Sequence, residues 1–328
     1  MQFGKDPNWF NTHGATATAR EIAQQGDCWE KIPALLATTN PALKNRLHAA
    51  LHDARATIAF SGAGTSAYVG DILAPAIQRH SRAHSLATAS TDLVAQPAGK
   101  LPRDAHGFLF AFARSGNSPE SVASLEKAAT IAPELVPVAV TCNDRGALAE
   151  HCRSGHGYCC QMPPETHDES FVMTSSFSTM TLFTAALCRE ALDLPPPDFA
   201  ALAVAQRHAR DTYYTSPALD ALARAARIIY LGSDALYGAA RESALKILEM
   251  TAGKIPTMAE TTLGFRHGPK SLINNETAVC FFISSDPYSQ QYDRDLALEV
   301  LGDGNAAHVH IYAPAAFLAR YPELAASR

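Results

Sequence analysis

The 328-residue sequence lacks any long hydrophobic run. A membrane-spanning helix needs about 20 consecutive apolar residues, so we expect no membrane contact. The polar segment 1–18 also has none of the features of a signal peptide. A basic stripe is missing too, because 27 Lys and Arg residues stand against 32 Asp and Glu residues, for a net charge of −5. We therefore expect no nucleic-acid partner.

Cysteine is scarce, with seven residues at irregular positions. An odd number of cysteines in a chain of this size predicts reduced thiols and a cytoplasmic location. One run contains residue types that bind metals, but its spacing does not match a Cys-x-x-Cys zinc pattern. Its members are His151, Cys152, His156, Cys159 and Cys160. We expect no metal site and no cofactor.

The residues that are present indicate an α/β protein. Residues 1–50 are predicted to form helices, and from about residue 55 short apolar runs alternate with helical stretches. This alternation predicts doubly wound, mostly parallel sheets with helices on both faces. Residues 58–62 are echoed at 228–232, and residues 110–115 at 280–285, both at an offset of 170. The shared offset indicates a duplicated unit.

The predicted organisation has three parts. An N-terminal helical segment (1–50) precedes a first α/β unit (51–195) and a second α/β unit (196–328). The proline-rich segment 194–198 is the expected linker.

Two loops of the first unit are suited to an anion. Residues 61–66 and 114–121 each follow a predicted strand and open a helix, where backbone N–H groups carry partial positive charge. They lack the lysine of a P-loop and the full G-x-G-x-x-G spacing, so a nucleotide is not favoured. The alternative is that these Ser, Gly and Asn residues only form turns and helix caps. In the second unit, Asp286 lies at the corresponding position and would repel an anion.

The helix predicted from about residue 241 carries Glu242, Lys246 and Glu249 on one stripe. Gly253 ends the helix, and a loop leads to His267. Two carboxylates, an amine and an imidazole are suited to moving protons on a sugar. The alternatives are a solvated, ion-paired helix face and a histidine that only forms a turn.

Together these motifs, over roughly residues 18–315, resemble the sugar isomerase (SIS) domain family in two copies. The resemblance implies two flavodoxin-like SIS units and extends to the isomerase half of glucosamine-6-phosphate synthase. Residues 64–66 and 114–118 match the family's phosphate loops, and Glu169 with residues 172–177 matches the segment lining the sugar. Residues 242–249 match its catalytic helix, and residues 267–269 match its ring-opening histidine.

The resemblance implies a role for each matched residue. Glu249 would move a proton between C1 and C2, Lys246 and Glu242 would orient and tune it, and His267 would open the sugar ring from a neighbouring subunit. The implied substrate-binding residues are Gly64, Thr65, Ser66, Arg114, Ser115, Asn117, Ser118, Glu169, Thr174 and Ser175. The implied partners are a sugar phosphate and at least one further copy of the chain.

Two residues depart from the family pattern, since Arg114 and Asn117 stand where Gln and Glu are common. A C-terminal tail with a lysine near the substrate is expected to be missing. The resemblance implies a deaminase for a hexosamine 6-phosphate, with galactosamine 6-phosphate as the first expected substrate.

Two alternatives to the deaminase are a plain aldose/ketose-6-phosphate isomerase and a non-catalytic sugar-phosphate sensor. Sensors of this family usually carry a basic helix-turn-helix unit, whose pattern residues 1–50 lack. A sensor also has no use for Glu249 and His267 together.

Overall fold

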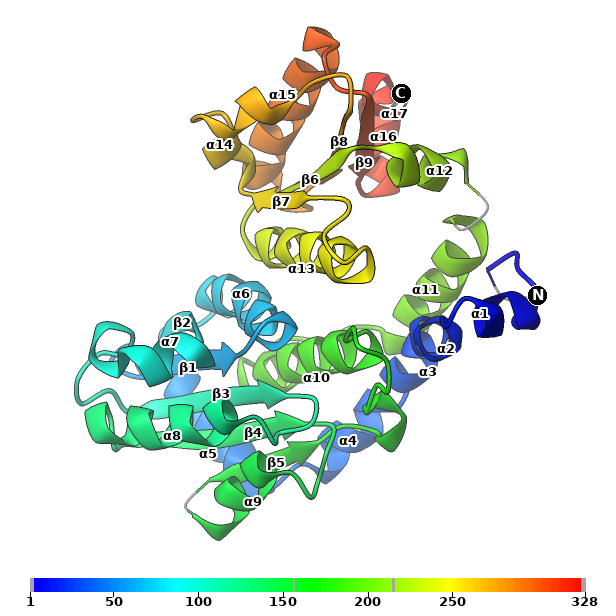
Figure 1. Ribbon diagram of the computed structural model, residues 1–328. Coiled ribbons are helices and arrows are strands. Elements are labelled where there is room, and N and C mark those ends of the chain that lie inside the picture. The colour runs from blue at the N-terminus through cyan, green and yellow to red at the C-terminus, as the bar shows by residue number, and fades with distance from the viewer. Residues whose placement is uncertain (1–2, 156, 214–215, 326–328) are drawn as a thin grey trace. The chain divides into compact units, whose positions relative to one another are not determined.

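The computed structural model describes residues 3–155, 157–213 and 216–325, and it divides into two compact units, 1–211 and 212–328. Each unit contains a parallel β-sheet, as the sequence predicted (Figure 1). The elements of the first unit are α1 (7–12), α2 (16–23), α3 (25–29), α4 (32–38), α5 (41–51), β1 (57–62), α6 (65–78), β2 (84–89), α7 (90–95), η1 (97–99), β3 (107–113), α8 (119–131), β4 (135–141), α9 (147–154), β5 (158–161), η2 (164–166), α10 (175–191) and α11 (199–213).

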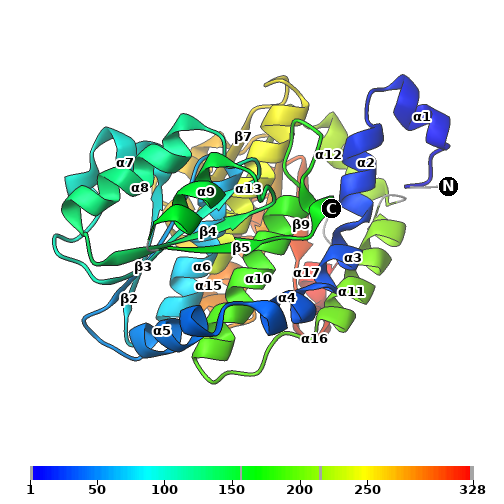
Figure 2. The same ribbon diagram turned by 90° about the horizontal axis from the view of Figure 1, so that it is seen from below.

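The first sheet has the order β2-β1-β3-β4-β5, which is the flavodoxin-like order, and every neighbouring pair is parallel. Helices α4, α5, α6 and α10 share a hydrophobic core with one face of the sheet. Helices α7, α8 and α9 cover the other face, and Figure 2 shows the two layers of helices on either side of β3, β4 and β5. The carboxyl ends of β1 and β3 are therefore neighbours, at the point where the strand order reverses.

Strand β3 shows how the two faces differ. Phe108, Phe110 and Phe112 all point into the core beneath α5, α6 and α10. Ala111 and Ala113 alternate with them and face α7, α8 and α9. Because side chains alternate along a strand, one sheet face is filled by aromatic rings and the other admits helices at close range.

Helix α11 packs against the N-terminal helices. Arg207 forms ion pairs with Asp27 at 2.6 Å and with Glu30 at 2.9 Å, and the Gln206 side chain donates a hydrogen bond to the Ile22 carbonyl at 3.0 Å. These contacts place α11 with the first unit. The boundary between the two compact units accordingly falls between residues 211 and 212 of the sequence, whereas the expected boundary lay between residues 195 and 196.

The second unit has a smaller sheet, with the order β7-β6-β8-β9 and parallel pairing throughout. Helices α12 and α13 pack on one face, and α14 to α17 pack on the other. Within the described parts of the chain, no helix combines the length and apolar character that a membrane crossing requires. The elements are α12 (217–224), β6 (227–232), α13 (235–250), β7 (257–260), α14 (262–265), η3 (269–272), β8 (277–282), α15 (287–303), β9 (308–312), α16 (315–320) and α17 (322–325).

Two strands were missing from the sequence prediction. Strand β2 was not recognised, and β7 forms where a loop was expected. Both are edge strands whose residues are mostly only partly buried. Neither strand has a continuous apolar run, which is the signal that marked the central strands.

The predicted repeat is confirmed at the level of the backbone. Strands β1 and β6 begin at residues 57 and 227, and strands β3 and β8 begin at 107 and 277, so both pairs are 170 residues apart. The loops after β1 and β6 also match, because Gly64 has φ 55° and ψ −127° while Asp234 has φ 56° and ψ −128°. This conformation lies outside the regions that L-residues favour. Asp234 therefore holds backbone strain directly before α13.

We predict that Gly64→Ala lowers the stability of the protein by about 1 kcal/mol, because alanine is strained at this positive φ and glycine is not. The effect acts through the backbone alone, since a Cβ there meets no atom within 4 Å. Urea or thermal unfolding measures the change. The matched control is Gly302→Ala within α15, where a Cβ also meets no atom within 4 Å and stability should not fall. Equal losses at the two positions would contradict the strain argument.

Candidate active site

The loop after β1 brings two predicted phosphate-binding residues to the start of α6. Thr65 and Ser66 are both buried, and Gly64 occupies the N-cap position before them. The Ser66 hydroxyl donates to the Met173 sulfur at 3.7 Å. The start of α6 therefore contacts the hydroxyl-rich segment 173–179, which lies more than a hundred residues further along the chain.

The loop after β3 is fastened to the loop after β4. The Asn143 side chain donates to the Ser115 backbone carbonyl at 2.8 Å, and the side-chain oxygen Oδ1 of Asn117 accepts from the Ala147 backbone N–H at 3.0 Å. The latter bond caps α9 and leaves the NH₂ group of Asn117 as the part that can donate to an anion. The Ser118 hydroxyl lies 2.7 Å from that of Ser121.

Ser118 is the N-cap of α8, and a proline occupies the first turn. The first backbone N–H groups of a helix have no partner within the helix and attract anions. Arg114, just before this turn, is half-buried and donates from Nη1 to the Ser170 carbonyl at 2.7 Å. The loop thus presents a guanidinium group beside a helix N-terminus, a combination suited to phosphate.

A carboxylate that the sequence analysis missed organises the segment before α10. Asp168 is buried and accepts hydrogen bonds from the Thr174 and Ser176 backbone N–H groups at 2.8 and 2.9 Å. It also accepts from the hydroxyls of Ser175 and Ser176. The Ser175 hydroxyl also accepts from Gln24, so this predicted sugar-binding residue points into the protein and supports the segment. An acidic residue shortly before a hydroxyl-rich helix start was the available signal.

Glu169 faces outward. Its side chain is 71% exposed and forms an ion pair with Arg20 at 3.0 Å. An exposed pair of this kind contributes little stability. Its backbone N–H, in contrast, points inward and donates to Glu21 at 2.7 Å.

In the second unit, α13 brings the three predicted catalytic charges together. The Lys246 ammonium lies 2.6 Å from a Glu249 carboxylate oxygen and 3.3 Å from a Glu242 carboxylate oxygen. The exposed fractions of the side chains are 9% for Glu242, 21% for Lys246 and 23% for Glu249. This stripe is therefore not a fully solvated helix face. A half-buried amine that bridges two carboxylates keeps both anions in fixed positions.

His267 follows α14 and is exposed. No hydrogen bond or ion pair of its imidazole is found among the residues that the structure describes. Its neighbours are anchored, because Arg266 and Lys270 both pair with Glu299 on α15. The loop is thus held in place by its neighbours, while the His267 side chain is exposed.

The loops of the second unit carry acceptors where those of the first unit carry donors. Asp293 is fully buried and accepts from the Ser233 hydroxyl after β6 and from the Ser284 backbone N–H after β8. Asp286 accepts from the backbone N–H groups of Tyr288 and Ser289 at the start of α15. Internal carboxylates therefore occupy the N–H groups that an anion would need.

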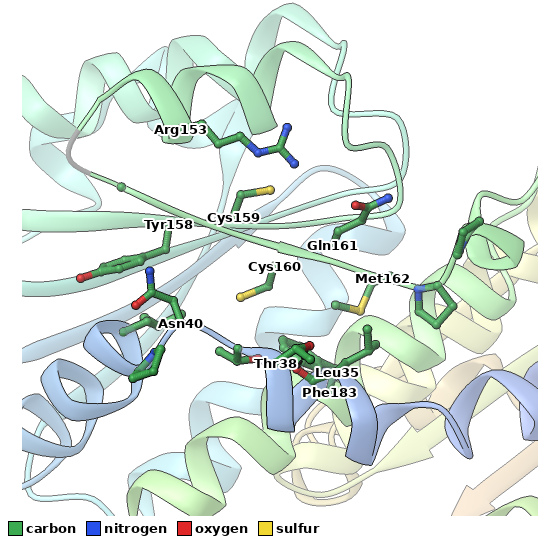
Figure 3. A pocket seen from close by; sticks show the side chains of 16 residues that line it. Leu35, Thr38, Asn40, Arg153, Tyr158, Cys159, Cys160, Gln161, Met162 and Phe183 are labelled. Atoms are coloured by element: carbon green, nitrogen blue, oxygen red, sulfur yellow. Dashed lines mark hydrogen bonds between the residues drawn. The ribbon is translucent and has the colours of Figure 1, made fainter.

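A cavity of about 870 Å³ lies along the outer edge of β5 (Figure 3). Cys160 and Met162 point toward the Leu35 and Phe183 side of the strand, and Arg153 lies on the other side. Burial raises the pKa of the Cys160 thiol to about 12, so this thiol stays protonated at neutral pH. The residues of the phosphate loops do not line this cavity.

The run considered for metal binding contributes Cys159 and Cys160 to that cavity, and His156 lies outside the described residues. Among the residues that are described, His48, His52 and Asp193 have potential ligand atoms close enough to share a metal. All three are exposed, and none belongs to the loops or the helix discussed above.

We predict that Asp168→Asn destabilises the protein by about 2–4 kcal/mol, because an amide NH₂ would face donors that now share a carboxylate. Urea unfolding checks this value. The matched control is its neighbour, with Glu169→Gln expected to change stability by less than about 0.5 kcal/mol. Equal effects at the two positions would refute the structural role of Asp168.

Known proteins are similar to this chain over most of its length. The SIS domain family matches residues 50–189 and 221–321. Over 306 residues the chain is 40% identical to the D-galactosamine-6-phosphate deaminase AgaS of Escherichia coli O157:H7, which covers 90% of this chain and 77% of that protein. It is 38% identical over 303 residues to the protein of the same name from Shewanella sp. (strain ANA-3), with the same coverage of 90% and 77%.

Solved structures are also similar to this chain over most of its length. The crystal structure of tagatose-6-phosphate ketose/aldose isomerase from Escherichia coli has a TM-score of 0.83 and 40% identity, covering 91% of this chain and 82% of that chain. Glucosamine-6-phosphate deaminase from Thermotoga maritima has a TM-score of 0.71 at 22% identity, covering 90% and 85%, which shows a shared fold. With two matched segments that span most of its length, the chain belongs to the SIS domain family.

Proposed function

We propose that this protein is an enzyme that converts galactosamine 6-phosphate and water to tagatose 6-phosphate and ammonia. The observation that carries the proposal is the half-buried Glu242–Lys246–Glu249 group on α13. The choice of substrate rests on identities of 38–40% to proteins named D-galactosamine-6-phosphate deaminase.

The proposed chemistry begins with ring opening. His267 transfers a proton to the ring oxygen while the C1 hydroxyl loses its proton, which breaks the bond between C1 and the ring oxygen and forms an aldehyde. Glu249 then removes the proton from C2, and the electrons of that C–H bond form a C1=C2 double bond. The π electrons of the C1 aldehyde move to its oxygen, which takes back the proton that the C1 hydroxyl lost, so that an enolamine results. Return of the proton to C1 yields a ketose imine at C2. Water adds to this imine, the C–N bond breaks, and ammonia leaves.

The geometry of α13 suits this proton transfer. Lys246 contacts Oε2 of Glu249 at 2.6 Å, so among the described residues Oε1 is the oxygen left to carry the proton. The ammonium group also favours negative charge developing on the substrate in a partly dehydrated site. Glu242 holds Lys246 from the other side and thereby orients the base.

The first unit is proposed to anchor the 6-phosphate. Residues 64–66 and 114–118 supply hydroxyl, amide and backbone donors with the guanidinium of Arg114. Binding energy from a phosphate remote from C1 and C2 can be used to hold the reacting carbons in position. Glu169, Thr174 and Ser175 are proposed to act through the segment that lines the sugar, with Ser175 supporting it from within.

A plain ketose/aldose isomerase is the second candidate, because a solved structure with 40% identity carries that name. Both reactions share the proton transfer between C1 and C2. They differ in whether the nitrogen at C2 is lost.

We further propose a cytoplasmic enzyme that forms a homodimer or a larger homo-oligomer. The free state of all seven cysteines supports a reducing compartment. The exposed side chain of His267 supports a role in a neighbouring copy of the chain.

We predict that the purified protein releases ammonia and tagatose 6-phosphate in equal amounts from galactosamine 6-phosphate, and does so faster than from glucosamine 6-phosphate. Glu249→Gln should lower kcat by about 10²- to 10⁴-fold with little change in KM, because the amide cannot accept the proton. A coupled ammonia assay and ketose quantification measure both.

The matched control is Glu276→Gln, the same substitution at an exposed residue of the same unit, and it should leave kcat unchanged. Ketose formation from an aldose 6-phosphate, with no ammonia from either amino sugar, would favour the isomerase instead. Tight binding without turnover would favour a sensor. Unchanged turnover in Glu249→Gln would remove this residue from the mechanism.

We predict that two inactive variants, Glu249→Gln and His267→Asn, regain activity when they are denatured together and refolded as a mixture. If His267 acts in the neighbouring subunit, random pairing into dimers restores about a quarter of the sites, since each mixed dimer has one site with both residues intact. Each variant refolded alone is the control. No recovery would show that both residues act within one chain.

A further inference from the structure

A buried carboxylate is among the contacts between the N-terminal helical segment and the segment before α10. Glu21 on α2 is 1% exposed. It accepts hydrogen bonds from the backbone N–H groups of Glu169 at 2.7 Å and Ser170 at 3.1 Å, and also from the Ser170 hydroxyl. Three donors share one carboxylate, so this buried charge is well compensated.

The same residue, Ser170, holds the arginine of the phosphate loop. Its carbonyl oxygen accepts from Arg114 Nη1 at 2.7 Å. A continuous chain of hydrogen bonds therefore runs from Glu21 through Ser170 to Arg114. It joins α2 to the loop after β3, across separations in sequence of 149 and 56 residues.

The partner of Arg114 in this chain is neutral. In the described part of the molecule no carboxylate forms an ion pair with Arg114, and a carbonyl oxygen fixes one of its nitrogens instead. The guanidinium group keeps its full positive charge while its planar set of donors is held in one orientation. The Glu21 carboxylate accepts hydrogen bonds from the groups around Ser170 and lies 3.6 Å from Arg20, so its negative charge is one residue removed from Arg114.

We propose that Glu21 is a positioning residue that sets the affinity of the first unit for a phosphate ester by orienting Arg114 through Ser170. The N-terminal helical segment is then part of the binding apparatus, although Glu21 itself touches no ligand. The phosphate ester as ligand rests on the proposed function, and the coupling of Glu21 to Arg114 rests on the hydrogen bonds above.

The test is a double-mutant cycle read by calorimetric binding of tagatose 6-phosphate to the full chain, with inorganic phosphate as a second probe. Glu21→Gln should weaken binding about tenfold, the effect of disturbing one hydrogen bond to a charged group. Arg114→Ala should weaken it at least as much. In the double variant, Glu21→Gln should add almost nothing to the effect of Arg114→Ala.

Glu165→Gln is the matched control. Glu165 also links the N-terminal helices to this part of the chain, through an ion pair with Lys31 at 2.7 Å, but its side chain is 49% exposed. The affinity of the Glu165→Gln variant for both probes should equal that of the unchanged protein. If Glu21→Gln does not fold, Ser170→Ala should weaken binding in the same direction by a smaller factor, because it removes the hydroxyl that contacts Glu21 and the Val172 carbonyl and keeps both backbone bonds.

Additive losses in the double variant would mean that Glu21 acts only on general stability, and they would overturn the proposal. So would an unchanged affinity in Glu21→Gln, an unchanged affinity in Ser170→Ala where that variant is needed, or no binding of either probe to the unchanged protein. Binding that shows the coupling without ammonia release from galactosamine 6-phosphate would refute the proposed reaction and still support this inference.

Discussion

The arrangement of the first unit depends on the pairing of inward-facing backbone N–H groups with two buried carboxylates. A peptide N–H removed from water without a partner costs as much as a lost hydrogen bond. Residues 167–174 lie outside strands and helices, and Ser175 and Ser176 open α10, so strand and helix ladders cannot supply those partners. Glu21 and Asp168 supply them instead. Their position decides where Ser170 and Thr174 lie, and through Ser170 it decides where Arg114 lies.

The two units share a backbone plan and differ in the polar groups that their loops carry. In the first unit the carboxyl ends of β1 and β3 carry hydroxyls, amides and an arginine. In the second unit the corresponding ends are bound to Asp293 and Asp286, which already occupy the backbone donors. The second unit carries its reactive groups along α13 instead. The same backbone plan therefore carries donor groups at the strand ends of the first unit and carboxylates at the corresponding ends of the second.

Most of the fold could be predicted from local patterns. Central strands such as β3 are apolar at every position because they are covered on both faces, and α13 carries its charges at helical spacing. The edge strands β2 and β7 could not be predicted this way, since polar residues interrupt the apolar run in both. Helix α11 was assigned to the second unit because it follows a proline-rich segment. Its ion pairs with Asp27 and Glu30 join residues about 180 positions apart, which no local pattern reveals.

The sequence by itself determined the chemical groups of the candidate site, because motif order and spacing place Ser115, Lys246 and Glu249 on known kinds of loop and helix. It also determined the repeat, since segments 170 residues apart in the sequence form corresponding strands of the two sheets. Only the tertiary structure decided which polar groups are buried and hydrogen-bonded inside the protein. Glu169 and Asp168 are adjacent acids, yet one is exposed and the other is buried beneath a helix start. That difference arises from contacts with distant segments, since burial and hydrogen-bond partners are properties of the packed chain.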